Sequence, residues 1–244
     1  EIYRCDWSSD VCSSDLIGAG EIGKSLFKVL SPTYETYIKD VENLDVKDIE
    51  VLNICYPMGK DFVKNTKKYI EIYKPKVTII HSTVSPGTTE LCGENVVHSP
   101  VHGKHPNLED GIKTFIKYIG GNNPFAVAKA QKFLKGAGIS TKLVANSKTS
   151  EISKILCTTY YGWNILFMKE VVEICKKYDV PFQEVYTDWN WFYNIGYEKL
   201  GMPQFKKYNL EPMDGKIGGH CVVNNCHLLK SKITDLIIKE NEKY

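Results

Sequence analysis

Short apolar runs alternate with amphipathic stretches from Ile17 onward. The runs are four to six residues long and bounded by turn residues, which predicts buried strands. The stretches between them repeat apolar positions at helical spacing, which predicts helices packed on a sheet. This alternation is typical of an α/β fold with a Rossmann-like parallel sheet, although the link at residues 40–50 is short for a crossover helix and predicts a trimmed unit. The predicted strands are residues 34–39, 51–56, 77–81, 95–98, 116–120 and 141–144, and the predicted helices are residues 21–30, 60–73 and 124–136.

The pattern changes after Asn146. Residues 149–178 carry apolar residues at helical spacing over roughly eight turns without a proline, which predicts one long helix. The aromatic segment at residues 185–205 is interpreted as core or as a dimer interface rather than a base-stacking surface. The sequence therefore predicts a Rossmann-like domain at residues 17–146 and a smaller all-helical domain at residues 147–244, built on the long helix.

Residues 1–16 do not fit this pattern. They are polar and rich in turn residues, at the place where a buried apolar strand normally precedes a glycine-rich turn. The segment DVCSSDL within them resembles the translated tail of a common sequencing adapter, and Arg4 is the only arginine among 31 basic residues. We therefore predict that residues 1–16 are a sequencing artefact on a metagenomic fragment and that the first strand is largely missing. A natural disordered tail is the alternative.

The composition excludes several classes of function. With 43% hydrophobic and 25% charged residues in 244, the chain is globular, and no apolar run approaches the ~20 residues of a membrane span. A net charge of +2 provides no strong field for nucleic acid, so the expected partner is a small-molecule substrate. The cysteines beyond residue 16 form no CxxC pair and the histidines lack zinc spacing, so we expect reduced thiols, a cytoplasmic protein and no metal.

A glycine-rich turn opens the first predicted helix. Its glycines have the spacing of a dinucleotide-binding turn, which lets the chain approach a pyrophosphate at the helix N-terminus. Asp40 ends the next predicted strand 22 residues after Gly18, where a carboxylate holds ribose hydroxyls and repels the 2′-phosphate of NADP. NAD is therefore the expected cofactor, and a turn that binds another ligand is the alternative. The predicted cofactor contacts are Gly18, Gly20, Glu21, Ile22, Gly23, Asp40, Tyr56, Ser82 and Thr83.

Two later motifs carry groups that could take part in chemistry. STVSPGTT at residues 82–89 follows an apolar strand, so its hydroxyls lie at the carboxyl end of the sheet, where such folds bind ligands. A helix cap with proline in the first turn would also explain this motif. GGHC at residues 218–221 places Cys221 beside two glycines, where a nearby cation would activate the thiol. A small buried apolar residue is the alternative role for this cysteine.

These motifs, with SEISKIL at residues 150–156 between them, occur in an order that resembles the UDP-glucose/GDP-mannose dehydrogenase family, within the wider 6-phosphogluconate-dehydrogenase-like group. The resemblance implies a nucleotide-sugar dehydrogenase of polysaccharide biosynthesis that uses two NAD+ to oxidise a primary alcohol to a uronate. It also implies a homodimer that pairs through the long helix. By this resemblance Cys221 attacks the intermediate aldehyde, Lys154 stabilises the oxyanion, and Thr83 positions the catalytic water.

The chain departs from the family pattern at three positions. The resemblance places Thr158 where the family has asparagine, Asn225 where it has aspartate, and Val101 where it has glutamate. Loss of the aspartate and glutamate carboxylates removes the usual general bases, and His102 or His105 would have to replace one of them. The chain also ends before the family's third, nucleotide-sugar-binding domain, and lysines would have to hold the diphosphate in place of arginines.

Two other functions fit the same residues. One is a two-electron hydroxyacid or sugar-acid dehydrogenase of the wider group, in which Lys154 performs acid–base chemistry and Cys221 is structural. The other is a NAD-binding relative that has lost catalysis, as the neutral residues Val101, Thr158 and Asn225 indicate.

Overall fold

The computed structural model describes residues 13–39, 49–103, 108–219 and 221–244. The described residues form two compact units, one that ends at Lys154 and one that comprises Ile155–Tyr244. Each unit is described by itself below.

Within its described residues, the first unit contains a seven-stranded sheet in the order β2-β1-β3-β4-β5-β6-β7. Neighbouring strands are parallel except β5 and β6, which are antiparallel. The α/β class is confirmed, and each predicted strand begins and ends within two residues of an observed one. The antiparallel pair was not predicted, because apolar patterning does not show the direction of a strand. The strands are β1 (Ser13–Ile17), β2 (Glu35–Lys39), β3 (Val51–Ile54), β4 (Val77–Ile80), β5 (Val96–His98), β6 (Lys117–Gly121) and β7 (Thr141–Leu143).

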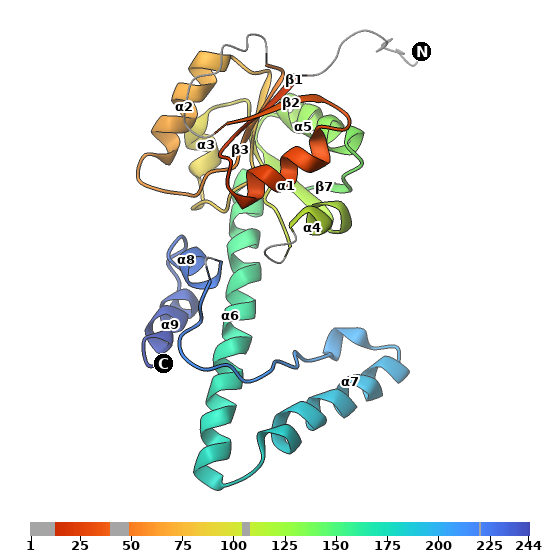
Figure 1. Ribbon diagram of the computed structural model, residues 1–244, viewed down its shortest axis with the longest axis vertical. Coiled ribbons are helices and arrows are strands. Elements are labelled where there is room, and N and C mark those ends of the chain that lie inside the picture. Colours follow the sequence, from red (N-terminus) through yellow and green to blue (C-terminus); the bar gives the residue numbers. More distant parts are fainter. Residues whose placement is uncertain (1–12, 40–48, 104–107, 220) are drawn as a thin grey trace. The chain divides into compact units, whose positions relative to one another are not determined.

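Helices cover both faces of this sheet (Figure 1). On one face α1 (Glu21–Leu30), α4 (Leu108–Thr114) and α5 (Pro124–Gly136) bury their apolar sides against β1 and β3–β6. On the other face α2 (Phe62–Tyr73) and α3 (Thr88–Cys92) pack against β1, β3, β4 and β5. The predicted bounds of α1 and α5 are confirmed, whereas α3 and α4 were missed because five to seven residues carry too little periodicity.

The segment predicted to lack the first strand does form one. Ser13–Ile17 is β1, and it pairs with both β2 and β3, so the expectation of a missing strand is wrong for these residues. Backbone hydrogen bonds do not require an apolar side chain, and Leu16 and Ile17 supply two buried ones. Asp15 shows the cost of the remaining polar residues, because it is fully buried and neither carboxylate oxygen has a hydrogen-bond partner among the described residues. Residues 1–12 lie outside the described part, and the origin of residues 1–16 stays a prediction.

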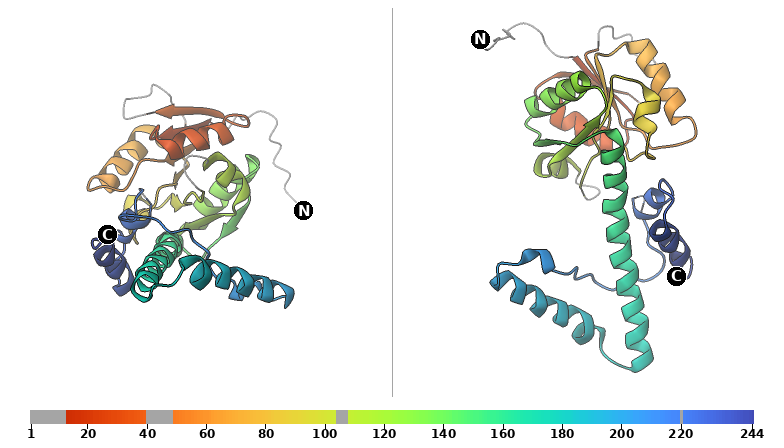
Figure 2. Two further views of the ribbon diagram at one scale, coloured as in Figure 1. Left: turned by 60° about the horizontal axis from the view of Figure 1, so that its bottom comes forward. Right: turned by 180° about the vertical axis from the view of Figure 1, so that it is seen from behind.

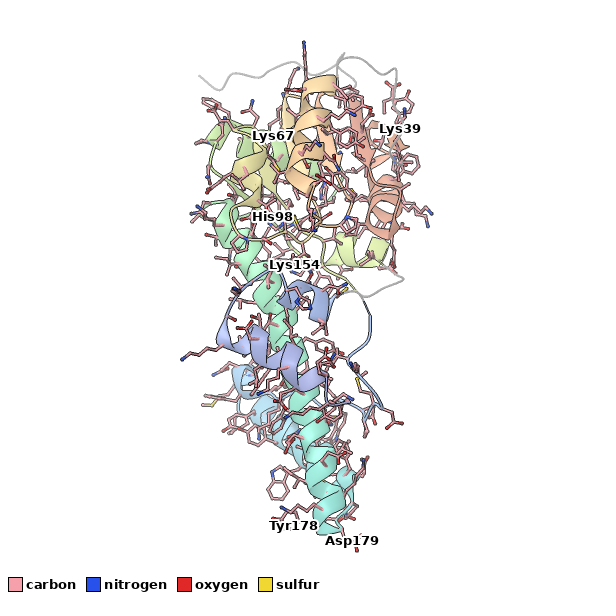
Figure 3. All side chains as sticks on the ribbon, turned by 90° about the vertical axis from the view of Figure 1, so that its left-hand side faces the viewer. Lys39, Lys67, His98, Lys154, Tyr178 and Asp179 are labelled. Carbon is pink, nitrogen blue, oxygen red and sulfur yellow. The ribbon has the colours of Figure 1, made fainter. Side chains whose placement is uncertain are left out.

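The long helix α6 (Ser147–Tyr178) has the predicted bounds of 149–178 within two residues. Its first turns, up to Lys154, belong to the first unit, and the second unit is built on the rest of the helix. Two helices, α8 (Val222–Cys226) and α9 (Lys232–Asn241), pack alongside α6 around the fully buried Ile237 (Figure 2). The described residues of this unit contain no strand, as predicted. The helix ends at Tyr178, because Asp179 takes a left-handed φ of 54° (Figure 3).

The aromatic segment after α6 is helical and largely exposed. It comprises a π-helix, Gln183–Asp188, the helix α7 (Trp189–Lys199) and a 3-10 turn, Pro203–Phe205. Trp189 and Phe192 on α7 are each 70% exposed, which argues against the core alternative for these two side chains. No helix among the described residues has both the length and the apolarity that crossing a membrane requires.

Candidate active site

Close backbone contacts shape the glycine turn between β1 and α1. Gly18 has a φ of 106°, and a Cβ there would lie 2.8 Å from the backbone nitrogen of Tyr56. A Cβ at Gly23 would lie 1.9 Å from the carbonyl oxygen of Gly18, so α1 begins directly against the turn. Gly20 differs, because nothing lies within 4 Å of its Cβ position. The fold therefore requires two of the glycines, and the third leaves open space at the N-terminus of α1.

This N-terminus of α1 is suited to an anion. Gly20 is the N-cap residue and has no side chain to close the helix, and the exposed Glu21 and the half-buried Ile22 begin its first turn. The first N–H groups of a helix and its dipole attract phosphate, so a dinucleotide pyrophosphate fits the space at Gly20. Asp40 lies outside the described residues. The residue before it, Lys39, is the last residue of β2. It pairs with Ile17, the residue directly before the glycine turn.

The loop that carries Thr83 is held at both ends. At its start the hydroxyl of Ser82 donates to the carbonyl oxygen of Tyr56 at 2.6 Å, which joins the ends of β3 and β4. At its end the buried carboxylate of Glu151, on α6, accepts from Gly87 N at 2.6 Å and from the N and Oγ1 of Thr89 at 2.8 and 2.6 Å. Hydrogen bonds to an ionised group contribute about 1.5–3 kcal/mol each. Glu151 therefore fixes this loop to the first turns of α6.

His98 makes a second connection between the same two elements. Its ring is fully buried at the end of β5, with Nε2 3.1 Å from the carbonyl oxygen of Ser82 and Nδ1 2.8 Å from the hydroxyl of Ser150 on α6. Burial, with smaller contributions from nearby positive charges, lowers the pKa of His98 to about 3. The ring is therefore neutral at physiological pH, and Nε2 carries the proton because a carbonyl oxygen only accepts.

Lys154 lies one helical turn after Ser150 on α6, close enough to His98 for its charge to lower the pKa of that ring (both are labelled in Figure 3). Burial is the main cause that lowers the pKa of His102 to about 4, and the charges of Lys154 and Lys117 add to it. Burial is also the main cause that lowers the pKa of Lys117, on β6, to about 7, and the charge of Lys154 lowers it to a smaller extent. Basic groups thus gather near the carboxyl ends of β4 and β5, which favours an anion or an oxyanion there.

A line of polar groups crosses the sheet below this edge. Asn53 donates to the hydroxyl of Ser14 at 2.9 Å, and its side-chain oxygen lies 2.9 Å from Nε2 of His81. The other ring nitrogen of His81 lies 3.2 Å from the carbonyl oxygen of Ser99, which also accepts from the buried ammonium of Lys117. These five residues lie on β1, β3 and β6 and directly after β4 and β5, so the core of the sheet holds a continuous polar chain.

Cys221 belongs to the second unit, where it precedes α8 and is partly exposed. Its carbonyl oxygen accepts from the backbone N of Asn225 at 3.3 Å, and the Asn225 side chain donates to the hydroxyl of Thr158 at 3.1 Å. Thr158 in turn donates to the carbonyl oxygen of Ile155 at 2.9 Å. The helix turn that begins at Cys221 is thereby attached to α6 within this unit. No cluster of three metal-ligating side chains occurs among the described residues.

The structure brings together part of the predicted site. The glycine turn, Tyr56 and Ser82 meet at one edge of the sheet, and Thr83 is connected to the α6 segment that carries Lys154. His105 lies outside the described residues, as Asp40 does. Sequence reasoning missed His98 and Glu151 as connecting residues, although Glu151 stands inside the SEISKIL motif and His98 ends a predicted strand.

The comparisons identify a class of fold. No protein-family model matches this sequence, and no curated protein matches it. Solved structures do: UDP-D-ManNAc dehydrogenase from Pyrococcus horikoshii has a TM-score of 0.77 at 18% identity, over 95% of this chain and 68% of that one. A UDP-glucose dehydrogenase from Pyrobaculum islandicum has a TM-score of 0.72 at 15% identity, over 98% and 69% of the two chains. The 3-hydroxyisobutyrate dehydrogenase of Mycobacterium tuberculosis has a TM-score of 0.69 at 11% identity, over 96% and 94%.

The chain thus has the fold of these dehydrogenases. The resemblance to nucleotide-sugar dehydrogenases that the motifs indicate is confirmed at the level of the fold. The chain spans about two thirds of the length of the two nucleotide-sugar dehydrogenases, whereas it spans nearly all of the 3-hydroxyisobutyrate dehydrogenase.

Proposed function

We propose that this chain is the cofactor-binding and central helical part of a NAD-dependent dehydrogenase that oxidises the primary alcohol of a nucleotide sugar to a uronate. The observation that carries the proposal is the attachment of the STVSPGTT loop to the α6 turns of the SEISKIL motif, beside an open glycine turn. Two motifs that are distant in the sequence are thereby held as one site. The order of the motifs and the shared fold support the same activity.

The cofactor would be held by the glycine turn. Gly18 and Gly23 shape the turn, and Gly20 leaves space for the pyrophosphate at the first turn of α1. Asp40 follows β2 in the sequence, and its carboxylate would hold the adenosine ribose and exclude a 2′-phosphate, so we propose NAD rather than NADP. When bound, NAD+ supplies the hydride acceptor.

The chain's own residues divide the remaining chemistry. Lys154 stabilises the alkoxide that forms when the alcohol loses its proton, and its positive surroundings suit that charge. The alkoxide would lose the first hydride to the bound NAD+ and become the aldehyde. The thiolate of Cys221 then adds to the aldehyde, the resulting thiohemiacetal loses the second hydride to a second NAD+, and a thioester remains. Water held by Thr83 adds to the thioester carbon, the Cys221 thiolate leaves, and the carboxylate is released.

The proposed site offers only a weak acceptor for the proton of the substrate alcohol. Val101 is buried and carries no proton acceptor, and His102, whose pKa is lowered to about 4, is neutral at pH 7 but weakly basic. General-base assistance contributes about 10²–10⁴-fold in typical enzymes, so we expect a slow enzyme.

We further propose a cytoplasmic homodimer that acts on a small-molecule substrate in polysaccharide biosynthesis. The exposed aromatic side chains on α6 and α7 support an interface between copies, because exposed aromatic side chains are enriched at such surfaces. They include Tyr160, Trp163, Phe167, Trp189, Trp191 and Phe192, which are 39–70% exposed.

The stoichiometry of NADH tests this function. The chain is incubated with limiting UDP-sugars and excess NAD+, and NADH is counted against sugar consumed. Two NADH per sugar, reduced to one or none in Cys221→Ser, is the expected result. One NADH per substrate with full tolerance of Cys221→Ala would favour a two-electron hydroxyacid or sugar-acid dehydrogenase, which the full-length match to a 3-hydroxyisobutyrate dehydrogenase also favours. Calorimetric NAD binding without turnover of any substrate would favour a non-catalytic relative.

A further inference from the structure

His98 is a buried titratable group to which the proposed mechanism gives no role. It connects three elements of the first unit: its backbone ends β5, Nε2 contacts the carbonyl oxygen of Ser82 after β4, and Nδ1 contacts Ser150 on α6. Ser82 is adjacent to Thr83 in the chain. Ser150 and Lys154 are four residues apart on a helix, so they lie on the same face. One imidazole ring therefore connects the residues that carry both candidate groups of this unit.

The hydrogen bonds of the His98 ring determine which of its nitrogens carries the proton. Nε2 donates to the carbonyl oxygen of Ser82, so in a neutral ring Nδ1 is an acceptor that faces the hydroxyl of Ser150 at 2.8 Å. That hydroxyl also lies 2.9 Å from the carbonyl oxygen of Ser147, so its single proton is shared between the two acceptors. The groups that face the ring from the packed elements are Lys117 on β6, Lys154 on α6 and His102 after β5, and each disfavours a second proton. A ring fixed as one neutral tautomer orients its neighbours and exchanges no proton with substrate at physiological pH.

The surroundings leave α6 little freedom at this point. A Cβ at Gly120 on β6 would lie 2.3 Å from the carbonyl oxygen of Asn146 and 2.5 Å from the hydroxyl of Ser150, so the start of α6 lies directly on the sheet. Glu151, which follows Ser150 in the chain, holds the end of the Thr83 loop at Gly87 and Thr89. His98 acts on the near end of the loop, through the carbonyl oxygen of Ser82.

We propose that His98 is a positioning residue, which holds the loop that carries Thr83 in register with the helix turn that carries Lys154. The proposal rests on the proposed function for its catalytic consequence, but the positioning itself does not depend on turnover. A misplacement of about 1 Å in an active site can lower the rate about 10²-fold. Loss of the ring should therefore affect the chemical step far more than cofactor binding at the glycine turn.

Three variants of the full chain test this role. His98→Leu removes both hydrogen bonds of the ring. Ser150→Ala removes the bond of the ring to α6, together with the bond from Ser150 to the carbonyl oxygen of Ser147, and leaves the bond to Ser82. Tyr34→Phe is the matched control, because it deletes one partly buried hydrogen bond to the carbonyl oxygen of Phe133, on α5. All three are first checked for cooperative thermal unfolding, and Ser150→Ala carries the test if His98→Leu does not fold.

The first readout is amide hydrogen exchange over residues 82–89, which needs no substrate. We expect exchange there to rise at least tenfold in His98→Leu and Ser150→Ala and to stay unchanged in Tyr34→Phe. Unchanged exchange in a folded His98→Leu or Ser150→Ala protein would overturn the proposal.

The second readout is turnover of the nucleotide sugar identified by NADH counting. We expect kcat to fall about 10²-fold in His98→Leu and about fivefold in Ser150→Ala, with KM for the sugar and Kd for NAD within threefold of the parent values. The pH profile of kcat should keep its shape, and a lost limb near neutral pH would mean proton transfer by His98 and would overturn positioning. If the parent chain turns over no sugar while exchange at 82–89 responds as expected, the proposed function fails and the positioning of the loop stands.

Discussion

The side-chain amide of Asn225 donates a hydrogen bond to the hydroxyl of Thr158 at 3.1 Å. These are two of the three positions at which the sequence departs from the family that it resembles. The two departures therefore contact one another within the second unit, next to the helix turn that begins at Cys221. Neither side chain is ionisable, so the pair can hold α8 against α6 but cannot accept a proton.

The Asn225–Thr158 contact should be measurable as a coupling energy. Asn225 is buried, and a neutral hydrogen bond contributes about 0.5–1.5 kcal/mol to stability. In a double-mutant cycle of Thr158→Val and Asn225→Ala, followed by urea unfolding, we expect a coupling of about 1 kcal/mol. Thr158→Val combined with Asn190→Ala is the control, because Asn190 bonds to Tyr208 instead and should be additive. A coupling below about 0.3 kcal/mol at the first pair would contradict the contact.

A carboxylate at position 225 should change the slow step of the proposed reaction. Asparagine at this position cannot act as a general base, so thioester hydrolysis should limit turnover after a rapid burst of NADH. We expect Asn225→Asp to remove the burst and to raise the steady-state rate by about 10²-fold in a stopped-flow experiment. Asn224→Asp carries the same charge at an exposed neighbouring site and should leave the burst in place. An unchanged burst in Asn225→Asp would place the slow step elsewhere.

The periodic parts of the fold could be predicted from the sequence, and the short or chemically inconsistent parts could not. α1 and α5 combine a strong apolar face with clear start and stop signals, so their bounds agree with the prediction. β1 was missed because Asp15 breaks its apolar pattern, and strand pairing through the backbone does not register in such a pattern. The short helix α3 depends on Glu151, a residue more than sixty positions away, which no local signal shows.

The candidate site also has a part that could be predicted from the sequence and a part that could not. The glycine turn was predictable because its geometry comes from local residues, and the structure shows why Gly18 and Gly23 must be glycine. The connection through His98 was not, because it depends on β4, β5 and α6 meeting at one point. A buried histidine can be assigned as a connecting residue only when its partners are known.

Replacing Asp15 should stabilise the first unit. Burial raises the pKa of Asp15 from 3.8 to about 6, so the folded protein holds the proton more tightly than the unfolded chain does. The unfolding free energy should therefore fall as the pH rises from about 4 to 6, by roughly 3 kcal/mol for a shift of about two pKa units. Asp15→Val removes this loss and buries an apolar side chain.

Urea unfolding at pH 4, 5, 6 and 7 checks this expectation. Asp15→Val should be roughly 3 kcal/mol more stable than the parent at pH 7, with the difference shrinking toward pH 4. Asp214→Val is the control, since Asp214 is exposed and its removal should add no such dependence on pH. A difference that is the same at every pH would mean that Asp15 does not titrate as a buried acid. It would also remove the physical argument that this segment is foreign to its strand.

Lys117, on β6, should make the unfolding free energy depend on pH in the direction opposite to that of Asp15. It is fully buried with no carboxylate partner among the described residues, and burial lowers its pKa from 10.5 to about 7. Above pH 7 the unfolded chain still binds the proton that the folded protein has released, so the unfolding free energy should rise with pH between about 7 and 10.5.

Lys117→Met keeps the length of the side chain and removes the ionisable group. The variant should be more stable than the parent at pH 7 by a few kcal/mol, and the difference should narrow as the pH rises. Lys142→Met, at an exposed position on β7, should follow the parent at every pH. If Lys117→Met is instead less stable at pH 7, the hydrogen bond from Lys117 to the carbonyl oxygen of Ser99 outweighs the cost of burying its charge, and the polar chain through His81 stabilises the sheet.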